Sequence, residues 1–376
     1  MKLSAILILD PRGNISLGGS DVIKRHENYG KHLTSLSNKL KLVVFTSNNS
    51  ERIIYNSKYL DRYVLSKPTI NSLLFAWRAY RCIIQERMDV KLLIAGDPWE
   101  SFWTALLLNK FLHKDIPIQM QIHGDIANPL WKNINIQNRM RYILAQLFCK
   151  KATAVRAVSK NQKINLIKNL RIVESKISVI PVPISLESLD LRKRKYLNRP
   201  SNITIIGRVH KDRGITFFLQ LLEKLTDISR DFSVIIIGSG KDELKFLSSV
   251  KQIIGSNKVK FVGQVSEKQL SRYWREIGVL VSLAPVESYG RVMREALVSG
   301  VPVWALESSG SKDLFSVERT GQIRHLDLDA TPDSLFIEFN KLLKARPNAA
   351  FRNKFMRENA ALPSLLVKSW VQLIKF

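Results

Sequence analysis

The 376-residue chain has few cysteines, a shortage of acidic residues and no long apolar run, and each shortage excludes a class of protein. Its two cysteines, Cys82 and Cys149, stand in apolar, helical contexts, which argues against a disulfide framework, a metal ribbon or a thiol enzyme and favours a reducing compartment. No stretch approaches the roughly 18 apolar residues of a membrane-spanning helix. The first apolar run ends in Asp-Pro-Arg-Gly rather than at a small-residue cleavage site, and therefore predicts a buried strand in a cytoplasmic protein.

The shortage of acidic residues leaves a large positive charge: 59 Lys and Arg stand against 32 Asp and Glu, a formal net charge of +27. Between Ile126 and Val173 there is no acidic residue, and basic residues mix with Leu, Ile and Phe. This pattern is typical of a surface that binds anionic lipid headgroups, although solvated helix faces of a generally basic protein explain it equally well. No zinc finger, RNP or similar signature accompanies the charge, so we expect no nucleic-acid partner.

The layout of the chain predicts two α/β domains. With 45% hydrophobic and 24% charged residues it is globular and long enough for two cores. Apolar runs rich in Val, Ile and Leu alternate with helix-patterned stretches, which predicts parallel sheets covered on both faces. The expected strands are 4–9, 40–47, 91–96, 117–123, 152–159 and 177–182 in the first half, and 202–207, 232–238, 259–263, 279–284 and 301–305 in the second.

The domain boundaries follow from a charged stretch without apolar periodicity, which runs from Ser185 to Ser201 and predicts a linker. We expect one doubly wound domain over 1–185, a linker over 186–200 and a second doubly wound domain over 201–362. An amphipathic stretch at 363–376 predicts a terminal helix.

Ligands of doubly wound sheets bind beyond the carboxyl ends of the strands, where this chain has glycine-rich and charged loops. The candidates there are Gly18, Gly19, His123, Arg208, Arg213, Gly238 and Glu287, and Glu295 lies inside the helix that follows the last of these loops. Two arginines at one strand end can neutralise a diphosphate, and with helix-start amides they can stabilise the charge that builds on it as it leaves, without a metal. The loops match neither GxGxxG nor a P-loop, which excludes the usual dinucleotide and kinase-type sites. His123 by itself fits a structural role as well as a catalytic one.

Two carboxylate patterns in the second half are candidates for catalytic or metal sites. Glu287 and Glu295 are eight residues apart, about 12 Å along a helix, whereas a hydrolase pair needs roughly 5–9.5 Å. They fit two contacts along one extended ligand. Alternatively, Glu287 is a partner of the helix dipole and Glu295 is a solvated helix residue. Asp327 and Asp329 form an Asp-x-Asp pattern, but they precede Thr331 and an apolar-periodic stretch, so helix capping is the simpler interpretation and no metal site is expected.

The segment VESYGRVMREALVSGVPVWA (286–305) resembles the E-x7-E region of the retaining glycosyltransferases of family 4. LGGSD (17–21), AVSKNQK (157–163) and GRVHKDRG (207–214) are similar to other motifs of that family and occur in the same order. The resemblance implies the GT-B fold, in which two Rossmann-like doubly wound parallel-sheet domains face a central cleft. It also implies an acceptor-side first domain, a terminal helix that crosses back to it, and sugar transfer with retention and without a metal or other cofactor.

The resemblance also implies roles for single residues. Arg208 and Arg213 would hold the donor diphosphate, Glu295 the ribose hydroxyls and Glu287 the hydroxyls of the transferred sugar, while His123 would lie near that sugar and the acceptor. The other implied contacts are Gly18 and Gly19 at the diphosphate, Gly238 in a glycine turn, Val265 at the nucleobase, and the backbone of Tyr289, Gly290, Arg291 and Val292 at the helix start. Arg213 stands where the family usually has lysine, and Arg291 where it usually has an aliphatic residue.

The expected function is therefore transfer of a sugar from a nucleotide-diphosphate sugar to a glycan or lipid-linked acceptor, in the synthesis of a cell-surface polysaccharide or glycolipid. An anionic membrane surface is a further expected partner, at the inner face of the plasma membrane. Two alternatives stay open: a sugar-nucleotide epimerase or hydrolase of the same fold, and a non-catalytic module that binds polyanions.

Overall fold

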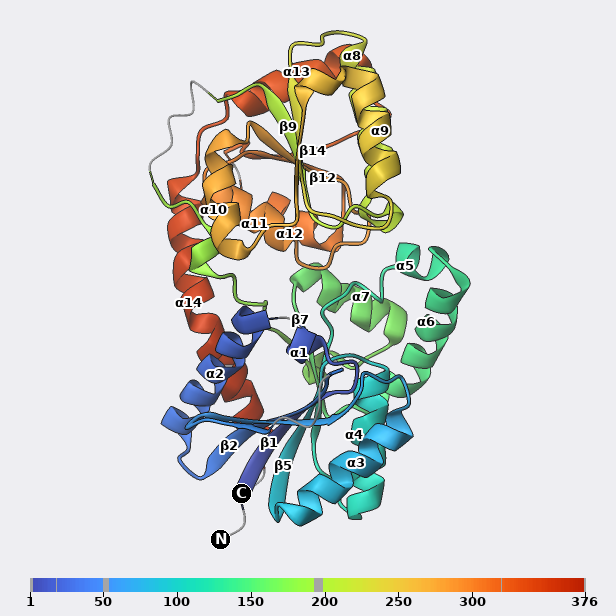
Figure 1. Ribbon diagram of the computed structural model, residues 1–376, viewed down its shortest axis with the longest axis vertical. Coiled ribbons are helices and arrows are strands. Elements are labelled where there is room, and N and C mark those ends of the chain that lie inside the picture. Colours follow the sequence, from blue (N-terminus) through green and yellow to red (C-terminus); the bar gives the residue numbers. More distant parts are fainter. Residues whose placement is uncertain (1–2, 18, 50–53, 193–198, 319, 375–376) are drawn as a thin grey trace. The chain divides into compact units, whose positions relative to one another are not determined.

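The computed structural model describes residues 3–17, 19–49, 54–192, 199–318 and 320–374, and the chain divides into two compact units (Figure 1). Unit 1 comprises Met1–Val182 and Ala360–Phe376, and unit 2 comprises Pro183–Asn359. Each unit is built on one mainly parallel sheet with helices on both faces. The predicted fold class, two doubly wound α/β domains, is therefore confirmed.

The sheet of unit 1 has the strand order β3-β4-β2-β1-β5-β6-β7-β8. Neighbouring strands pair in parallel except β3, which is antiparallel to β4. The strands are β1 (Leu3–Asp10), β2 (Leu40–Ser47), β3 (Ile54–Asn56), β4 (Leu60–Ser66), β5 (Met88–Ala95), β6 (Ile118–Gln121), β7 (Ala154–Ala157) and β8 (Ile177–Val179). The order reverses at β1, which lies between β2 and β5, and β1 therefore marks the switch point where a doubly wound sheet binds ligands.

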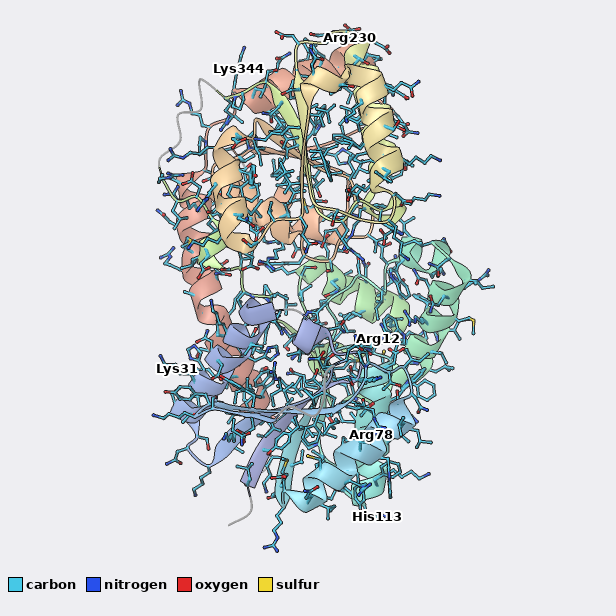
Figure 2. All side chains as sticks on the ribbon, viewed as in Figure 1. Arg12, Lys31, Arg78, His113, Arg230 and Lys344 are labelled. Carbon is cyan, nitrogen blue, oxygen red and sulfur yellow. The ribbon has the colours of Figure 1, made fainter. Side chains whose placement is uncertain are left out.

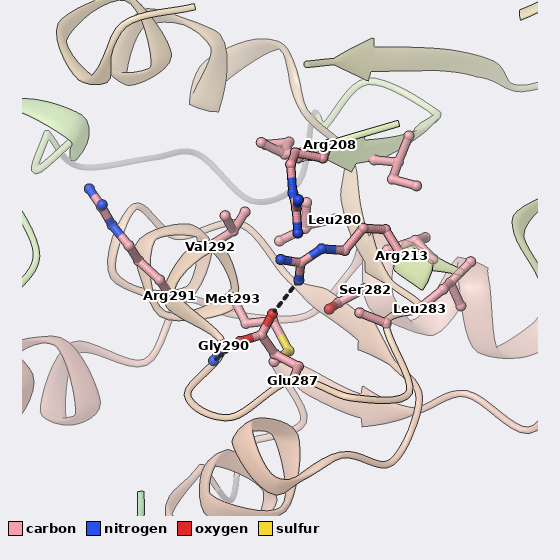
Figure 3. A pocket seen from close by; sticks show the side chains of 15 residues that line it. Arg208, Arg213, Leu280, Ser282, Leu283, Glu287, Gly290, Arg291, Val292 and Met293 are labelled. Carbon is pink, nitrogen blue, oxygen red and sulfur yellow. Dashed lines mark hydrogen bonds and ion pairs between the residues drawn. The ribbon is translucent and has the colours of Figure 1, made fainter. Parts of the chain in front are cut away.

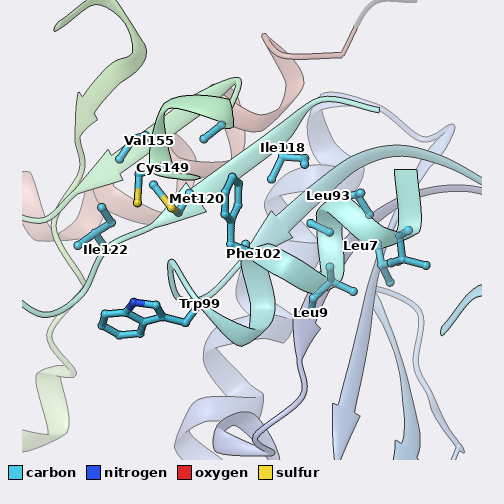
Figure 4. Packing of buried hydrophobic residues seen from close by; sticks show 14 of the residues in the cluster. Leu7, Leu9, Leu93, Trp99, Phe102, Ile118, Met120, Ile122, Cys149 and Val155 are labelled. Carbon is cyan, nitrogen blue, oxygen red and sulfur yellow. The ribbon is translucent and has the colours of Figure 1, made fainter. Parts of the chain in front are cut away.

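Helices bury both faces of this sheet. Apolar side chains of α3, α4, α6 and α7 cover one face, and those of α2 and the end of α14 cover the other. The helices are α1 (Asn14–Leu17), α2 (Gly19–Leu36), α3 (Ser72–Gln85), α4 (Glu100–Leu112), α5 (Pro129–Asn133), α6 (Ile136–Phe148), α7 (Lys160–Leu170) and α14 (Ala349–Val371). Figure 4 shows Phe102, Met120 and Cys149 packed in the first of these cores. Burial raises the pKa of the Cys149 thiol to about 12, so this cysteine is part of the apolar core.

The sheet of unit 2 has the order β11-β10-β9-β12-β13-β14, with all described pairs parallel. Its strands are β9 (Asn202–Ile206), β10 (Ser233–Ile237), β11 (Val259–Gly263), β12 (Val279–Ser282), β13 (Val303–Ala305) and β14 (Ile323–His325). Its helices are α8 (Ile215–Thr226), α9 (Glu243–Ile254), α10 (Glu267–Tyr273), α11 (Arg291–Val298), α12 (Ser309–Val317) and α13 (Pro332–Leu343). Helices α8, α9 and α13 cover one face and α10, α11 and α12 the other. The strand order reverses at β9, between β10 and β12.

The chain passes from unit 1 to unit 2 between Val182 and Pro183. Part of the predicted linker, 193–198, lies outside the described residues. The part that precedes it is tied to unit 2, where the Nε1 of Trp274 donates a hydrogen bond to the carbonyl oxygen of Ser188 at 2.6 Å.

The terminal helix begins earlier than the sequence pattern indicates. The stretch from Pro363 predicts its start there, whereas α14 begins at Ala349 and runs through Pro363. Its residues up to Asn359 belong to unit 2 and those from Ala360 onward to unit 1, so this helix carries the chain from one unit to the other. In unit 2 the Asn359 side chain both donates to and accepts from the backbone of Ile184, at 2.9 and 2.8 Å.

Basic side chains are distributed over both units, for example Arg12, Lys31 and Arg78 in unit 1 and Arg230 and Lys344 in unit 2 (Figure 2). Among the residues that the structure describes, no helix is long and apolar enough to cross a bilayer.

Replacing Trp370 with alanine tests how strongly the end of α14 holds to unit 1. The Trp370 ring is fully buried, packs edge-on against Tyr29, and its Nε1 donates to Oε1 of Gln119 at 2.8 Å. We expect Trp370→Ala to lower the free energy of unfolding by about 3–5 kcal/mol in urea denaturation. Leu365→Ala changes an exposed position of the same helix and should stay within about 0.5 kcal/mol of the wild type. A similar loss in both variants would contradict this account.

Candidate active site

A cavity of about 390 Å³ lies at the switch point of unit 2. It is lined by the end of β9, the end of β12, the loop before α8 and the start of α11. Six of the residues predicted for the site line it: Arg208, Arg213, Glu287, Gly290, Arg291 and Val292. The structure therefore brings together side chains from three separate segments at the sheet edge where the sequence places a ligand site.

Two glycines give the loop after β9 its course. Gly207 has a φ of 139°, and Gly214, with a φ of 77°, ends the 3₁₀ turn Lys211–Arg213 and precedes α8. A Cβ on Gly214 would lie 2.1 Å from the carbonyl oxygen of Leu283, just after β12. The loop that carries Arg213 is thus held against the end of β12, and a side chain at position 214 would push the two apart.

The Glu287 carboxylate connects this loop to helix α11. Its Oε2 accepts a hydrogen bond from Nη1 of Arg213 at 3.2 Å, and its Oε1 accepts from the backbone amides of Tyr289 and Gly290 at 3.4 and 3.2 Å. Figure 3 shows Arg213 pointing at Glu287 with Arg208 beside it. Both partners of the ion pair are partly exposed, so the pair adds only about 0–1 kcal/mol of stability. Its main effect is to orient the two side chains.

The cavity carries an excess of positive charge. Arg208, Arg213 and Arg291 line it, and Glu287 is the acidic member of the lining. Helix α11 begins beside them with Gly290 as its N-cap, a residue that has no side chain to cap the first amides. Unsatisfied amides and the positive end of the helix dipole add to the attraction for an anion. The site is therefore suited to a ligand with clustered negative charge.

Glu295 is enclosed instead of lining the cavity. It is only 2% exposed, and its Oε1 accepts hydrogen bonds from Nε of Arg291 at 3.0 Å and from Oγ of Ser188 at 3.1 Å. Burial raises the pKa of its carboxyl, although the Arg291 charge opposes this. Arg291 also contacts Glu267 and points away from the Arg213–Glu287 pair (Figure 3). In this structure Arg291 covers the carboxylate that the resemblance assigns to a ribose.

Arg294 was not among the residues predicted from the sequence, although it supports the start of α11. Its guanidinium lies 3.9 Å from the centre of the Tyr289 ring, and both side chains are buried. Burial lowers the pKa of Arg294 and raises that of Tyr289. Tyr289 therefore packs behind the start of α11, where it fixes the turn whose backbone borders the cavity. The sequence signal for Arg294 was its position on the buried side of the E-x7-E helix.

Three other predicted residues of this set lie away from the cavity lining. A Cβ on Gly238 would meet the carbonyl oxygen of Gly207 at 1.9 Å, so this glycine permits two loops to cross closely. Val265 is half-buried against the core on the α10–α12 side of the sheet. In unit 1, Gly19 begins α2, and Gly18 lies outside the described residues.

His123 lies in unit 1, at a second cavity of about 310 Å³ beyond the carboxyl ends of β1, β5 and β6. The side chain is exposed into this cavity, where desolvation by the surrounding protein, together with the charges of Arg156 and Arg25, lowers the pKa of its imidazole. A neutral imidazole has one nitrogen that donates and one that accepts, which suits contact with sugar hydroxyls.

The Asp-x-Asp pattern forms a local turn. The backbone amide of Asp329 donates to Oδ1 of Asp327 at 3.0 Å, and Thr331 is the N-cap of α13, accepting from the amide of Ser334 at 3.3 Å. The structure thus supports helix capping for this segment. Among the described residues, His, Cys, Asp and Glu form no cluster of three that could hold a metal ion.

Comparison with protein families identifies both halves of the chain. The model described as Glycosyltransferase Family 4 matches residues 27–188, and that described as Glycosyl transferases group 1 matches residues 190–352. Together they cover most of the chain. The chain belongs to the group 1 and family 4 glycosyltransferases.

Individual proteins are similar over shorter or more divergent stretches. An uncharacterised 41.2 kDa protein in the cps region of Klebsiella pneumoniae is 29% identical over 216 residues, which are 54% of this chain and 56% of that protein. This chain thus spans about half the length of that relative. Among solved structures, the apo form of the lipopolysaccharide outer core galactosyltransferase WaaB aligns with a TM-score of 0.71 at 15% identity, over 98% of this chain and 99% of the other. Anabaena Alr3699/HepE in complex with UDP and glucose aligns with a TM-score of 0.63 at 16% identity, over 98% and 96%. These likenesses confirm the GT-B fold for this chain.

Removing the Arg291 charge tests how Glu295 is held in place. We expect Arg291→Leu to lower the free energy of unfolding at pH 7 by about 1–3 kcal/mol, because a buried carboxylate loses its counter-ion. A folded-state pKa above the ordinary 4.5 means that stability falls as pH rises past that value, and the variant should show a steeper fall than the wild type. Urea denaturation at pH 5 and pH 7 measures this.

The isosteric change Glu295→Gln provides the control, because it removes the titrating group. In the Glu295→Gln background, Arg291→Leu should have a small effect that is the same at both pH values. An equal loss from Arg291→Leu at pH 5 and pH 7 in the otherwise wild-type chain would show that packing, and not charge, links the two residues.

Proposed function

We propose that this chain transfers a sugar from a nucleotide-diphosphate sugar to a glycan or lipid-linked acceptor, in the synthesis of a cell-surface polysaccharide or glycolipid. The observation that carries the proposal is the cavity of unit 2, where Arg208, Arg213 and the start of α11 surround the Glu287 carboxylate. Guanidinium groups pair with phosphates, and a carboxylate accepts hydrogen bonds from hydroxyls. A ligand with a diphosphate at one end and a sugar at the other matches both.

The similar proteins support the same class of donor and product. The Anabaena structure contains UDP and glucose, WaaB is described as a lipopolysaccharide outer core galactosyltransferase, and the Klebsiella protein is described from a cps region. From these descriptions we propose only the class of reaction for this chain. The sugar and the base of its donor are to be determined by experiment.

In the proposed reaction, the bond from the anomeric carbon to the diphosphate oxygen breaks and its electron pair goes to the diphosphate. The new bond joins that carbon to an acceptor oxygen, whose proton passes to the departing diphosphate. Arg208, Arg213 and the α11 amides would stabilise the charge on the departing diphosphate, the part that a divalent cation plays in metal-dependent transferases. On this basis we propose a metal-independent reaction, and the E-x7-E pattern supports retention of configuration.

The two glutamates would each exchange a protein partner for the donor. Glu287 would accept from hydroxyls of the transferred sugar in place of Arg213, which then turns to the diphosphate. Glu295 would accept from the ribose hydroxyls once Arg291 moves aside. We assign His123 of unit 1, with its neutral imidazole, to the sugar and acceptor.

We also propose that the protein works in the reducing cytoplasm, at the inner face of the plasma membrane. Both cysteines are free thiols in the structure, and Cys149 is fully buried. Nucleotide sugars are the donors available to a transferase there, and a lipid-linked acceptor would present its glycan at the same surface.

A panel of UDP-, GDP-, ADP- and dTDP-sugars, assayed for release of the nucleoside diphosphate with EDTA present, tests the reaction. We expect release from one donor, with a rate that rises when mixed lipid and glycan acceptors are added. Release that no acceptor accelerates would favour the epimerase or hydrolase. Neither release nor donor binding would favour the polyanion-binding module and contradict the proposal.

Single substitutions test the assigned residues. We expect Arg208→Ala and Arg213→Ala to lower kcat by about 10²–10³-fold, since each removes a donor that stabilises the leaving group. Glu287→Gln should also lower turnover sharply, while its amide oxygen can still accept from the backbone amides of Tyr289 and Gly290. Arg230→Ala, at an exposed position of unit 2, is the matched control and should keep the wild-type rate. Wild-type rates in folded Arg208 and Glu287 variants would reject the assignment.

A further inference from the structure

The outer side of helix α6 carries an unusual stripe of exposed apolar residues. They are Ile136, Met140, Ile143 and Leu147, which are 79%, 62%, 52% and 63% exposed. Their spacing of four, three and four residues aligns them along one side of the helix. The opposite side buries Tyr142 and Ala145 in the core of unit 1. The helix is thus apolar on both its core side and its outer side.

Neighbouring helices extend this apolar surface. Helix α5, directly before α6, exposes Leu130, and Ile134, the residue after α5, is exposed too. Helix α3 exposes Leu73, Trp77 and Ile84. Because α3, α4 and α6 all bury their inner sides against the same face of the sheet, their exposed sides all point away from it. We refer to the exposed sides of α3, α5 and α6 together as the α3–α6 face.

Ring contacts join these helices into one layer. Trp77 of α3 packs against Phe111 of α4 with ring centres 6.0 Å apart, and Trp103 of α4 packs against Phe148 of α6 at 6.2 Å. Helix α4 therefore packs against both α3 and α6, and the three helices form one layer on the same face of the unit 1 sheet. Figure 1 shows α3, α4 and α6 in unit 1.

The charge of the α3–α6 face is of one sign. The sequence has no acidic residue from 62 to 85, which includes α3, or from 126 to 173, which includes α5 and α6. The basic residues of these helices and of the turn after α6 are Arg78, Arg81, Lys132, Arg139, Arg141, Lys150 and Lys151. Within the described part of the chain, neither Arg139 nor Lys150 forms a salt bridge, and both are exposed. An apolar stripe is therefore flanked by unneutralised positive charge.

We propose that the α3–α6 face docks on an anionic lipid surface, with the α6 stripe inserted among the headgroups. A helix that lies in a membrane interface has this combination of an apolar stripe and flanking Lys and Arg. A second copy of this chain is a poor occupant, because a symmetric interface would bring two positive faces together. The proposal rests on the membrane location in the proposed function and names the surface that would hold the protein there. Donor binding tests the site separately, since the α3–α6 face belongs to unit 1 and the arginine-lined cavity to unit 2.

Co-sedimentation of the full chain with vesicles tests the proposal. We expect the chain to bind vesicles of phosphatidylcholine mixed with phosphatidylglycerol, to bind phosphatidylcholine alone much less, and to lose binding as salt is raised. Ile143→Asp should reduce the bound fraction at limiting lipid about tenfold. Ile337→Asp is a matched control on α13 of unit 2, where the isoleucine is also 52% exposed, and should bind as the wild type does.

A second pair of variants separates the charge from the apolar stripe. Arg139→Glu should weaken binding to the anionic vesicles, and Lys344→Glu in unit 2 should not. Circular dichroism and donor binding, which is expected to be unchanged, verify that each variant is folded. Equal recovery with neutral and anionic vesicles, or wild-type binding by Ile143→Asp, would overturn the proposal. Sedimentation velocity would also overturn it if the wild type forms an oligomer that Ile143→Asp dissociates while the variant still binds vesicles.

Discussion

Neighbouring parallel strands end at the same edge of a sheet, and the candidate site of unit 2 depends on this constraint. Strands β9 and β12 are adjacent in space although two other strands separate them in sequence. Arg213 and Glu287 are 74 residues apart, yet they meet because one follows β9 and the other follows β12. The close contact of Gly214 with the end of β12 then fixes the distance between the two loops. The topology brings the charges together, and the glycines let them approach.

The charges of the site already satisfy one another without a ligand. Glu287 is held by Arg213 and by two backbone amides, and Glu295 by Arg291 and Ser188. At these two glutamates a donor would therefore replace existing hydrogen bonds, and only the difference between the two sets would appear as affinity. The exchange is easier at the partly exposed Glu287 than at the buried Glu295, because a buried carboxylate without a hydrogen-bond partner costs more free energy. In the proposed complex, access of a ribose to Glu295 would thus depend on the motion of the Arg291 side chain.

The sequence predicted what depends on periodicity, and it missed what depends on packing. Continuous apolar runs revealed most strands, whereas β4, with its Asp-Arg-Tyr centre, and the short β14 lack such a run. The start of α14 at Ala349 was hidden by a charged stretch and by Pro363, which usually signals a helix start. Arg208, Arg213 and Glu287 were found because they stand at strand ends. Arg291 covers Glu295, and the Arg294 guanidinium lies over the Tyr289 ring. Both contacts depend on side-chain conformation, which the spacing of residues along the chain does not encode.

The large positive charge of the chain acts at two different ranges. In the cavity of unit 2, a few arginines are fixed by loops and by a carboxylate, so their effect on an anion is short-ranged and depends on geometry. On the α3–α6 face, flexible and exposed side chains act through their summed field, which salt screens within about 8–10 Å. The partly enclosed arginines are screened less than the exposed ones. Raising the ionic strength should therefore weaken the proposed docking on an anionic lipid surface before it weakens the binding of an anion in the cavity.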